Sequence, residues 1–311
     1  MTQLAFPSDW LREAIADLPS EGAGLLGHGL WGPIIDLRDG TLLKLVRHRA
    51  GIGDGLDIQE NEARVLAALG GRRLGPLEVP RLVAHGVFAA HTSAAAHGYA
   101  AWLRLSRVAG RPFGEEQLAR LSERERDRFA ANFGETIAIL QDNANGAFND
   151  SAALDDRVSA LLAGLATTSP ADVELCGALA EMLRAIPEGR RPGFVHGDAH
   201  LSNLLIGEDG LVCGVIDFAE AGCGFPEIDL VYLHWLPEIA ARVRRSYEAA
   251  AAHRVDETAY HLAGAIYALT GAVIAEQNAG SDDAAADRRL LGVCLEAIGL
   301  GRREARPLKQ R

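Results

Sequence analysis

The sequence predicts an α+β protein with a small β-rich lobe at the N-terminus and a larger, mainly helical lobe after it. Up to about residue 105, short apolar runs rich in β-branched residues alternate with turn residues, which is typical of strands. After Gly110-Arg111-Pro112 the apolar residues recur at helical spacing over long segments. We therefore expect a first lobe at 1–105, a connection at 106–110 and a second lobe at 111–311.

The first lobe should contain four strands and two helices. Asp39-Gly40 is a strong hairpin signal between two β-type runs, because Gly tolerates the positive φ of a tight turn. Gly70-Gly71 ends an amphipathic helical pattern for the same reason. These signals predict helices at 11–18 and 57–69 and strands at 31–37, 41–46, 79–88 and 99–105.

The second lobe should be helical except around one hairpin. Phe194-Val195 is a short apolar strand, and Glu208-Asp209-Gly210 is turn chemistry between two further β-type runs. The helical periodicity on either side predicts helices at 115–142, 153–166, 171–185, 229–245, 257–276 and 282–298.

The most informative polar residues stand beside that hairpin. His196-Gly197-Asp198 opens a loop that reaches Asn203, and Asp217 ends the second strand of the hairpin. Phosphoryl transfer needs a carboxylate to take the proton of the acceptor hydroxyl, and hard oxygen ligands for Mg²⁺. In this pattern Asp198 would be the base, and Asn203 with Asp217 would be the metal ligands.

The spacing His-Gly-Asp-x-x-x-x-Asn, followed by Ile216-Asp217-Phe218, resembles the aminoglycoside phosphotransferase and choline kinase family, which shares the protein-kinase fold. The resemblance implies a bilobal protein-kinase-like fold and transfer of the γ-phosphate of ATP, or of GTP, to a hydroxyl of a small molecule with Mg²⁺. It also implies that the first lobe binds the nucleotide and that the second holds the catalytic loop and the acceptor site.

Lys44 is the only charge within its β-type run, and it shares a strand face with apolar residues. In the following helix, Asp57 and Glu60 have the spacing of a capping box, which assigns Glu60 to the helix end. Glu62 instead falls on the apolar stripe, where a carboxylate needs a cation. We therefore predict a Lys44–Glu62 ion pair, which matches the pair that the resembled family uses to hold phosphates.

Two nucleotide contacts follow from the resemblance. The segment after the last strand of the first lobe would be the hinge, with the Ser106 carbonyl and the Val108 N–H reading the adenine edge. The pattern G-x-G-x-x-G at 22–27 is preceded by a helix and followed by strands, which excludes a dinucleotide-binding unit. These glycines are better interpreted as a strand-turn-strand flap over phosphates, with Gly27-His28-Gly29 at its tip.

Departures from the family pattern bear on the acceptor. Asp229 is retained and is expected to brace the catalytic loop through hydrogen bonds to its backbone. Phe225 replaces the usual carboxylate, Gln141 stands where many members carry His, and the tail at 301–311 is basic. Drug-modifying relatives use carboxylates of the C-terminal region to bind polycationic substrates, so these departures weaken the antibiotic interpretation. Aminoglycoside, choline or ethanolamine, homoserine, sugar and macrolide acceptors all stay open.

Composition restricts the partners. The net charge of −11 argues against nucleic acid and permits cationic substrates. No secretory signal and no membrane-spanning run are evident, and the four cysteines lack paired spacing, so we expect a cytoplasmic protein that does not bind membranes. The oligomeric state, monomer or homodimer, stays open.

Two other functions are compatible with parts of the pattern. A nucleotide-binding pseudokinase would keep the fold without transfer activity. Such a degenerate site would usually lack one of five residues that are all present here, namely Lys44, Glu62, Asp198, Asn203 and Asp217. A metal-dependent hydrolase could use His196, Asp198 and His200 as ligands, with His234 as a loose further candidate. Its protein ligands would be borderline-metal donors rather than the oxygens that suit Mg²⁺.

Overall fold

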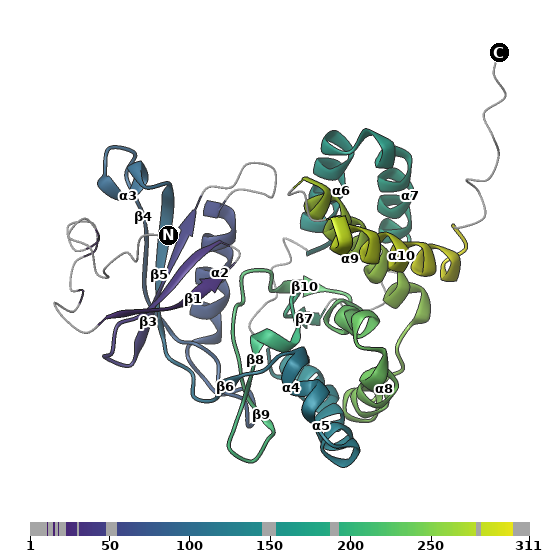
Figure 1. The fold of residues 1–311 in the computed structure, drawn as a ribbon, viewed down its shortest axis with the longest axis horizontal. Coiled ribbons are helices and arrows are strands. Elements are labelled where there is room, and N and C mark those ends of the chain that lie inside the picture. The colour runs from purple at the N-terminus through teal and green to yellow at the C-terminus, as the bar shows by residue number, and fades with distance from the viewer. Residues whose placement is uncertain are drawn as a thin grey trace. The chain divides into compact units, whose positions relative to one another are not determined.

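The computed structural model describes residues 23–29, 31–47, 55–144, 154–186, 193–277 and 281–300, together with Leu11, Ile15 and Leu18. The chain forms two compact units (Figure 1). The first comprises Met1–Gly114 and Leu201–Ala221, and the second comprises Glu115–His200 and Gly222–Arg311. The predicted α+β class is confirmed, with a β-rich first part and a mainly helical second part. The boundaries differ from the expected ones, since 111–114 and 201–221 belong with the first unit.

An antiparallel sheet forms the centre of the first unit. Its strands among the described residues are arranged in the order β1-β2-β3-β5-β4. The β2–β3 hairpin turns through Arg38 and Gly40, both with positive φ (61° and 85°), as the Asp39-Gly40 signal predicts. The strands are β1 (Gly24–Gly29), β2 (Gly32–Asp36), β3 (Thr41–Arg47), β4 (Leu82–Val87) and β5 (Tyr99–Ser106), with a short helix α3 (Ser93–Ala96) between the last two.

The predicted flap tip at Gly27-His28-Gly29 is wrong. These residues continue β1, and its pairing with β2 extends through His28↔Pro33 to Gly29↔Gly32. The last pair of this ladder is Gly29 with Gly32, so Gly27 and His28 lie within the paired strand and not at a tip. The glycines do not break the strand, because ladder hydrogen bonds to β2 compensate for their conformational freedom.

Helix α2 (Gly55–Leu69) begins two residues before the predicted start. Asp57 therefore lies inside its first turn, and the predicted capping box with Glu60 is wrong. A Cβ on Gly55 would lie 2.4 Å from the carbonyl oxygen of Arg47, so the start of the helix needs this close approach to β3. The predicted end is confirmed, since Gly70 and Gly71 both have positive φ.

A helix was predicted at 11–18, near the N-terminus. Most of this segment lies outside the described residues. Leu11 and Ile15 are buried in the core of the first unit together with Ile35, Leu43 and Tyr99. The amide of Ile15 donates to the carbonyl of Leu11 at 3.0 Å, which is the spacing of a helical turn.

A second small sheet contains the predicted hairpin. It joins β6 (Arg111–Pro112), β8 (Leu204–Ile206) and β9 (Val212–Val215), and the 3₁₀ turn η3 (Leu201–Asn203) leads into β8. Glu78 donates its amide to the Cys213 carbonyl at 2.8 Å, and its own carbonyl accepts from Val215 at 3.0 Å. These hydrogen bonds fasten the hairpin to the chain between α2 and β4, which explains why 201–221 belongs with the first unit.

The second unit is built from helices around a two-stranded sheet of β7 (Gly193–Val195) and β10 (Gly222–Gly224). Two predicted helices are interrupted. The segment 115–142 divides at Ser122, whose hydroxyl and amide exchange hydrogen bonds with Glu125 and start a new helix. The segment 229–245 divides at Pro237, which begins an α-helix after a long 3₁₀ segment. The elements are α4 (Glu115–Arg120), α5 (Glu123–Ala144), α6 (Leu154–Thr168), η2 (Pro170–Asp172), α7 (Val173–Arg184), η4 (Pro226–Trp235), α8 (Pro237–Ala251), α9 (Glu257–Gln277) and α10 (Ser281–Ala297).

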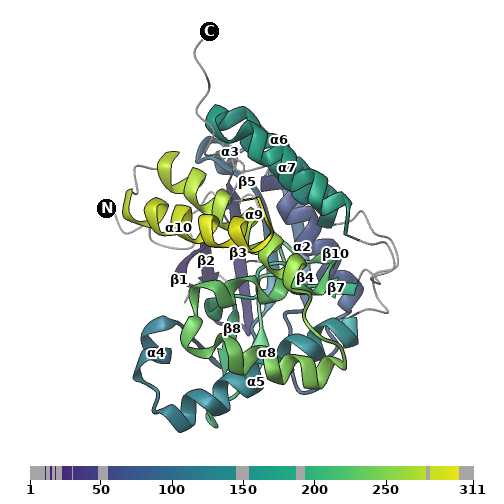
Figure 2. The same cartoon turned by 90° about the vertical axis from the view of Figure 1, so that its right-hand side faces the viewer.

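Helices α9 and α10 lie side by side, and α9 passes through the core of the second unit (Figure 2). Among the described residues, α9 is the one helix long and apolar enough by composition to cross a membrane. Of its most apolar window, 61% is buried inside the unit, against α6, α7, η4 and α10. Burial of most of this window is the pattern of a core helix.

Candidate active site

Lys44 lies at the centre of the polar cluster in the first unit. It is on β3 with a side chain only 8% exposed, and Nζ donates to Glu62 Oε2 at 2.8 Å and to Asp217 Oδ1 at 2.7 Å. The predicted Lys44–Glu62 contact is therefore present. The second contact was not predicted, because nothing in the sequence shows that Asp217, 173 residues later, reaches the same lysine.

The charges of this cluster depend on one another. Burial would lower the pKa of Lys44, but the carboxylates of Asp217 and Glu62 outweigh it and hold that pKa above its usual range, so the lysine stays protonated. Burial raises the pKa of the Glu62 carboxyl, which Lys44 opposes. With all three ionised, one positive charge faces two negative charges. The resulting excess negative charge suits a cation.

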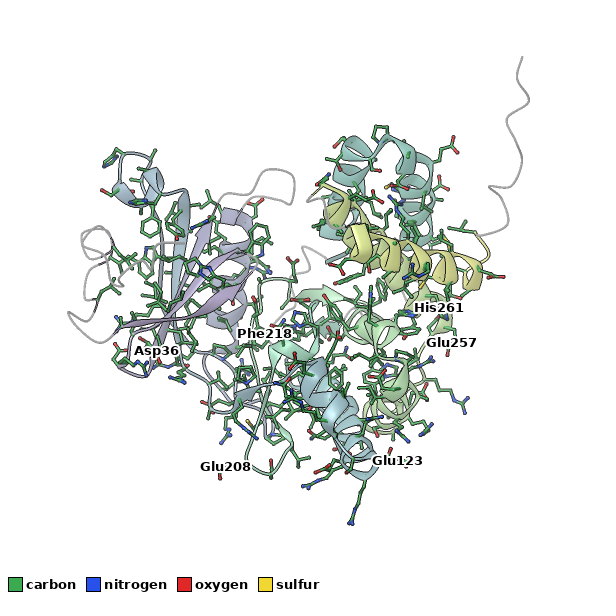
Figure 3. All side chains as sticks on the ribbon, in the orientation of Figure 1. Asp36, Glu123, Glu208, Phe218, Glu257 and His261 are labelled. Atoms are coloured by element: carbon green, nitrogen blue, oxygen red, sulfur yellow. The ribbon has the colours of Figure 1, made fainter. Side chains whose placement is uncertain are left out.

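Asp217 has an unusual backbone, with φ at 64° in the left-handed region. Asp tolerates this conformation better than most residues, and such outliers gather at functional sites. The side chain of Asp217 is 33% exposed, so this carboxylate is accessible while Glu62 is not. Phe218, labelled in Figure 3, follows it and is fully buried, and its backbone amide hydrogen bond lowers the pKa of Glu62.

Asn203 and Asp217 lie at the same end of the β8–β9 hairpin. Leu204 pairs with Val215, and the carbonyl of Asn203 accepts from the amide of Ile216 at 3.0 Å. The two predicted metal ligands are thus neighbours across the hairpin in the same unit. An amide oxygen and a carboxylate are oxygen donors of the kind that Mg²⁺ prefers, so these residues fit the expected ion.

Asn61 holds this arrangement from α2 and was missed by the sequence analysis. Its Nδ2 donates to the carbonyls of Ala219 at 2.7 Å and Ala221 at 3.0 Å. The helix that carries Glu62 is thereby tied to the segment after Asp217. No sequence signal identifies Asn61, since a polar residue next to a buried glutamate is common on amphipathic helices.

The predicted hinge residues lie where β5 ends. The Ser106 amide donates to the Arg81 carbonyl, and Ser106 Oγ accepts from the Arg81 amide, both at 2.8 Å. Val108 is buried, and a Cβ on Gly214 would lie 2.5 Å from its Cγ1. Both residues are therefore fixed in the first unit. Their contacts with an adenine edge stay a prediction.

In the second unit, Asp229 braces the loop that contains Asp198. Its Oδ2 accepts from the His196 amide at 3.0 Å, and its Oδ1 accepts from the Gly197 amide at 2.8 Å. This is the predicted bracing. Gln141 Nε2 also donates to Asp229 Oδ2 at 3.0 Å and to the Pro226 carbonyl at 3.0 Å. The glutamine that departs from the family pattern thus helps to hold the Asp229 carboxylate.

Asp198 is itself held by two side chains. Tyr232 Oη donates to Asp198 Oδ1 at 2.5 Å, and His200 Nε2 lies 3.3 Å from Asp198 Oδ2. Burial alone would raise the pKa of Asp198, but the hydrogen bonds from His200 and Tyr232 outweigh it and hold the pKa below its usual range. The carboxylate is therefore ionised at neutral pH, and a quarter of its side-chain surface is exposed (25%). Tyr232 was not predicted, because it lies 34 residues away in the sequence.

The hydrolase alternative finds no support in this loop. His196 is fully buried, and its Nδ1 lies 3.3 Å from the Asp198 amide, which donates to it. Within the part of the chain that the structure describes, the one group of three His, Cys or carboxylate ligand atoms close enough to share a metal lies elsewhere. Phe225 is also explained, since it is 5% exposed and packs in the core of the second unit.

Comparison with known families identifies the chain. The sequence model of the phosphotransferase enzyme family (APH) matches residues 45–263 of the 311, which include Glu62, Asp198, Asn203 and Asp217. The chain belongs to this family. The match to the family model confirms the predicted family. Comparison with curated proteins finds no match.

Solved structures of phosphotransferases share the fold of this family member. The GDP and kanamycin complex of APH(2")-IIIa is 18% identical, with a TM-score of 0.63 over 92% of this chain and 97% of that one. ADP-bound aminoglycoside phosphotransferase APH(2'')-Ib is 18% identical, with a TM-score of 0.60 over 93% and 97%. Macrolide 2'-phosphotransferase type I is 21% identical, with a TM-score of 0.53 over 87% and 91%. The predicted protein-kinase-like fold is confirmed by these similarities.

Proposed function

We propose that this phosphotransferase moves the γ-phosphoryl group of ATP or GTP to a hydroxyl of a small molecule, with Mg²⁺. The observation that carries the proposal is the position of Lys44 Nζ between Glu62 Oε2 and Asp217 Oδ1, at 2.8 and 2.7 Å. A buried lysine held by two carboxylates, one of them partly exposed, is suited to binding phosphate oxygens beside a cation. The structures of APH(2")-IIIa with GDP and APH(2'')-Ib with ADP support a nucleotide as co-substrate.

The residues of the first unit would bind the nucleotide. Lys44 contacts phosphate oxygens, and Glu62 keeps the lysine in place. Asn203 and Asp217 would hold Mg²⁺, which neutralises negative charge on the phosphates and on the transferred group. The Ser106 carbonyl and the Val108 amide read the adenine edge.

The residues of the second unit would act on the acceptor. Asp198 accepts the proton of the acceptor hydroxyl while the oxygen of that hydroxyl forms a bond to the γ-phosphorus. The bond from that phosphorus to the β-phosphate oxygen breaks, and the nucleoside diphosphate leaves with that electron pair. A carboxylate of low pKa is a weak base, so we expect the proton to move late in the reaction. Asp229, Gln141 and Tyr232 would keep Asp198 in position.

The acceptor is proposed only as a class, a small molecule with a free hydroxyl. The structures named above contain kanamycin in one case, and another is a macrolide phosphotransferase. In this chain the burial of Phe225 removes one side chain expected near an acceptor, and the net charge of −11 favours neutral or cationic molecules. Free thiols at Cys176, Cys213, Cys223 and Cys294 are consistent with a cytoplasmic location.

A screen of hydroxylated metabolites and antibiotics for acceptor-dependent release of ADP or GDP tests this function. We expect Mg²⁺-dependent release with at least one acceptor, and loss of about 10²–10⁴ in rate for Asp198→Ala. Nucleotide binding without any acceptor-dependent release across the panel would instead favour the pseudokinase. Release that persists in Asp198→Ala at the wild-type rate would contradict the assigned base.

A further inference from the structure

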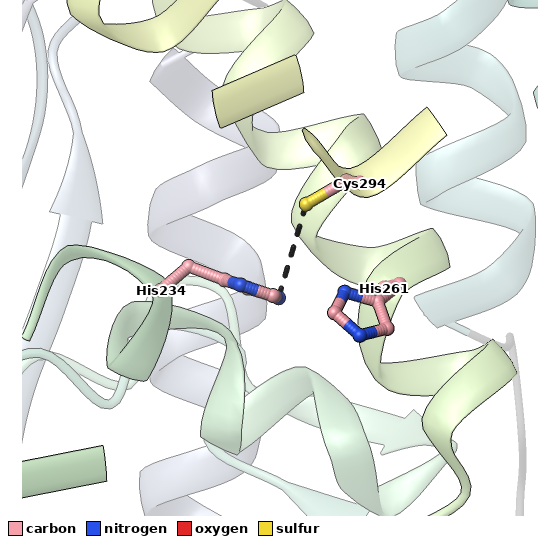
Figure 4. A group of neighbouring side chains, drawn as sticks. All are labelled: His234, His261 and Cys294. Atoms are coloured by element: carbon pink, nitrogen blue, oxygen red, sulfur yellow. Dashed lines mark hydrogen bonds between the residues drawn. The ribbon is translucent and has the colours of Figure 1, made fainter. Parts of the chain in front are cut away.

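A cluster of three ligand-type side chains lies in the second unit. His234 on η4, His261 on α9 and Cys294 on α10 place their nitrogen and sulfur atoms within 4.8 Å of one another (Figure 4). His234 Nε2 lies 4.0 Å from Cys294 Sγ, and the rings of His234 and His261 have centroids 5.2 Å apart. The three residues come from three elements and converge on one point between them.

The backbone around this point is shaped to leave room. Gly264 lies three residues after His261 on the same face of α9. A Cβ at Gly264 would lie 2.5 Å from His234 Nε2 and 2.8 Å from Cys294 Sγ. Any other residue would push the imidazole and the thiol out of their positions, so this glycine is what permits the approach of the two donors.

His261 adds a second, independent observation. Its Nδ1 is buried and has no hydrogen-bond partner among the residues that the structure describes, although buried polar atoms are usually paired. In Figure 4 one nitrogen of the His261 ring is turned toward His234 and Cys294. The other nitrogen, Nε2, lies 3.9 Å from Glu257 Oε2, one turn earlier on α9, and both residues are labelled in Figure 3. This is an ion-pair distance and not a hydrogen bond, so Glu257 would orient a metal-bound His261 only after moving closer to it.

The protonation states are compatible with metal binding. Burial lowers the pKa of His234 to about 4, which favours the neutral imidazole. Its Nε2 also lies 3.4 Å from the Tyr260 carbonyl, so a metal bound at Nε2 would replace that contact. Burial raises the pKa of the Cys294 thiol to about 11. A bound cation would displace that thiol proton, as it does at other thiolate sites.

We propose that His234, His261 and Cys294 form a zinc site in the second unit. Two imidazoles and a thiolate are the ligands that Zn²⁺ prefers, and they do not suit Mg²⁺. With ligand bonds of roughly 2.0–2.3 Å, tetrahedral donors are about 3.3–3.7 Å apart. Donors 4.8 Å apart must therefore approach each other by about 1.1–1.5 Å to take one ion, which is less than about 1 Å for each side chain. The fourth position is left for water or another small ligand.

The site would join η4 to α9 and α10. Tyr232, which holds Asp198, stands two residues before His234 on η4. A metal at His234 would thus stiffen the end of the segment that orients the proposed base. The zinc site does not rest on the proposed function, because the binding of zinc can be measured without any acceptor or nucleotide.

The test uses the full-length protein, purified without an affinity tag that binds metals. Zinc is measured by mass spectrometry after dialysis against the ion, and cobalt is then substituted to detect a thiolate-to-metal charge-transfer band. Cys294→Ala and His261→Gln remove ligands. Cys176→Ala is the matched control, because Cys176 is another buried helical cysteine in the same core. Circular dichroism checks that each variant is folded.

We expect one zinc per chain in the wild type and in Cys176→Ala, with the charge-transfer band in both. Cys294→Ala should lose the band, and both ligand variants should bind zinc with more than about tenfold lower affinity, the least that loss of an orienting partner costs. Absence of zinc and of the band in the folded wild type would overturn the proposal. So would unchanged zinc affinity in folded Cys294→Ala and His261→Gln. If these variants do not fold, the cobalt spectrum of the wild type decides alone.

Discussion

Lys44 Nζ and Asp217 Oδ1 lie 2.7 Å apart, although Lys44 is on β3 and Asp217 follows β9, 173 residues later. Asp217 reaches the lysine with its backbone in the left-handed region. The lysine that would bind phosphates is therefore paired directly with the carboxylate that would bind Mg²⁺. Binding of a magnesium nucleotide would exchange this ion pair for contacts of each partner with the ligand.

Asp217→Asn should abolish the stabilisation of the protein by a magnesium nucleotide. Asparagine tolerates the left-handed backbone, so the change removes the charge without adding strain. In the wild type the nucleotide should add about 2.7 kcal/mol to the free energy of unfolding at a hundred times its Kd. Thermal melts with and without Mg²⁺ measure this. Asp198→Ala is the control and should keep the full shift while losing turnover. A wild-type increase in melting temperature in Asp217→Asn would contradict the assignment of Asp217 as a Mg²⁺ ligand.

Glu62→Gln should raise KM for the nucleotide or lower kcat by about tenfold, with little change in fold. The amide fills the same space but no longer holds Lys44 by charge, so the lysine is free to move from the phosphates. Glu60→Gln is the matched control, because Glu60 is exposed on the opposite side of α2 and should change stability by less than about 0.5 kcal/mol. Steady-state kinetics on both variants decide. A kinetic defect in Glu60→Gln alone would reverse the assignment.

Gln141→Leu should reduce both stability and turnover. Gln141 is 7% exposed and joins Asp229 to Tyr247, whose Oη donates to Gln141 Oε1 at 2.8 Å. Removing it leaves buried polar groups with one partner fewer, at a cost of about 1–3 kcal/mol. Tyr247→Phe keeps the donor to Asp229, so it should lower stability by about 0.5–1.5 kcal/mol and leave kcat unchanged. Urea unfolding and kinetics separate the two. Equal losses of kcat in Gln141→Leu and Tyr247→Phe would mean that the hydrogen bond from Gln141 to Asp229 does not carry the effect on turnover.

Protonation of Asp198 should not lower the rate in mild acid. Its pKa is held below the usual range, so the carboxylate becomes protonated, and inactive as a base, only when the pH falls below that range. Because the pKa of Asp198 is lower in the folded protein than in the unfolded chain, its ionisation stabilises the fold at a pH above the unfolded-chain value. That stabilisation is lost as the pH falls through the lower pKa of the folded protein. Tyr232→Phe removes one stabilising hydrogen bond and should raise this pKa, which shifts the acid limb of kcat/KM to higher pH. An acid limb unmoved by this change would exclude Asp198 as its source.

Local pattern was sufficient for most elements of the first unit and for the phase of α2. Alternation and turn residues act over a few neighbours, so β2, β3 and β5 were predicted to within one or two residues. The inward position of Glu62 followed from helical periodicity alone, and its contact with Lys44 followed because a buried carboxylate requires a cation. The start of α2 was mistaken because it is set by the approach of Gly55 to Arg47, which is a contact between elements.

The sequence by itself determined the family, the α+β class and the chemical types of the site residues, since motif spacing and periodicity are properties of the chain. Tertiary structure alone decided which distant groups meet. Tyr232 on Asp198, Gln141 on Asp229, and Asp217 on Lys44 are contacts between residues 34 to 173 positions apart. No local preference encodes them, because they arise only when separate helices and strands pack and each buried polar group must find a partner.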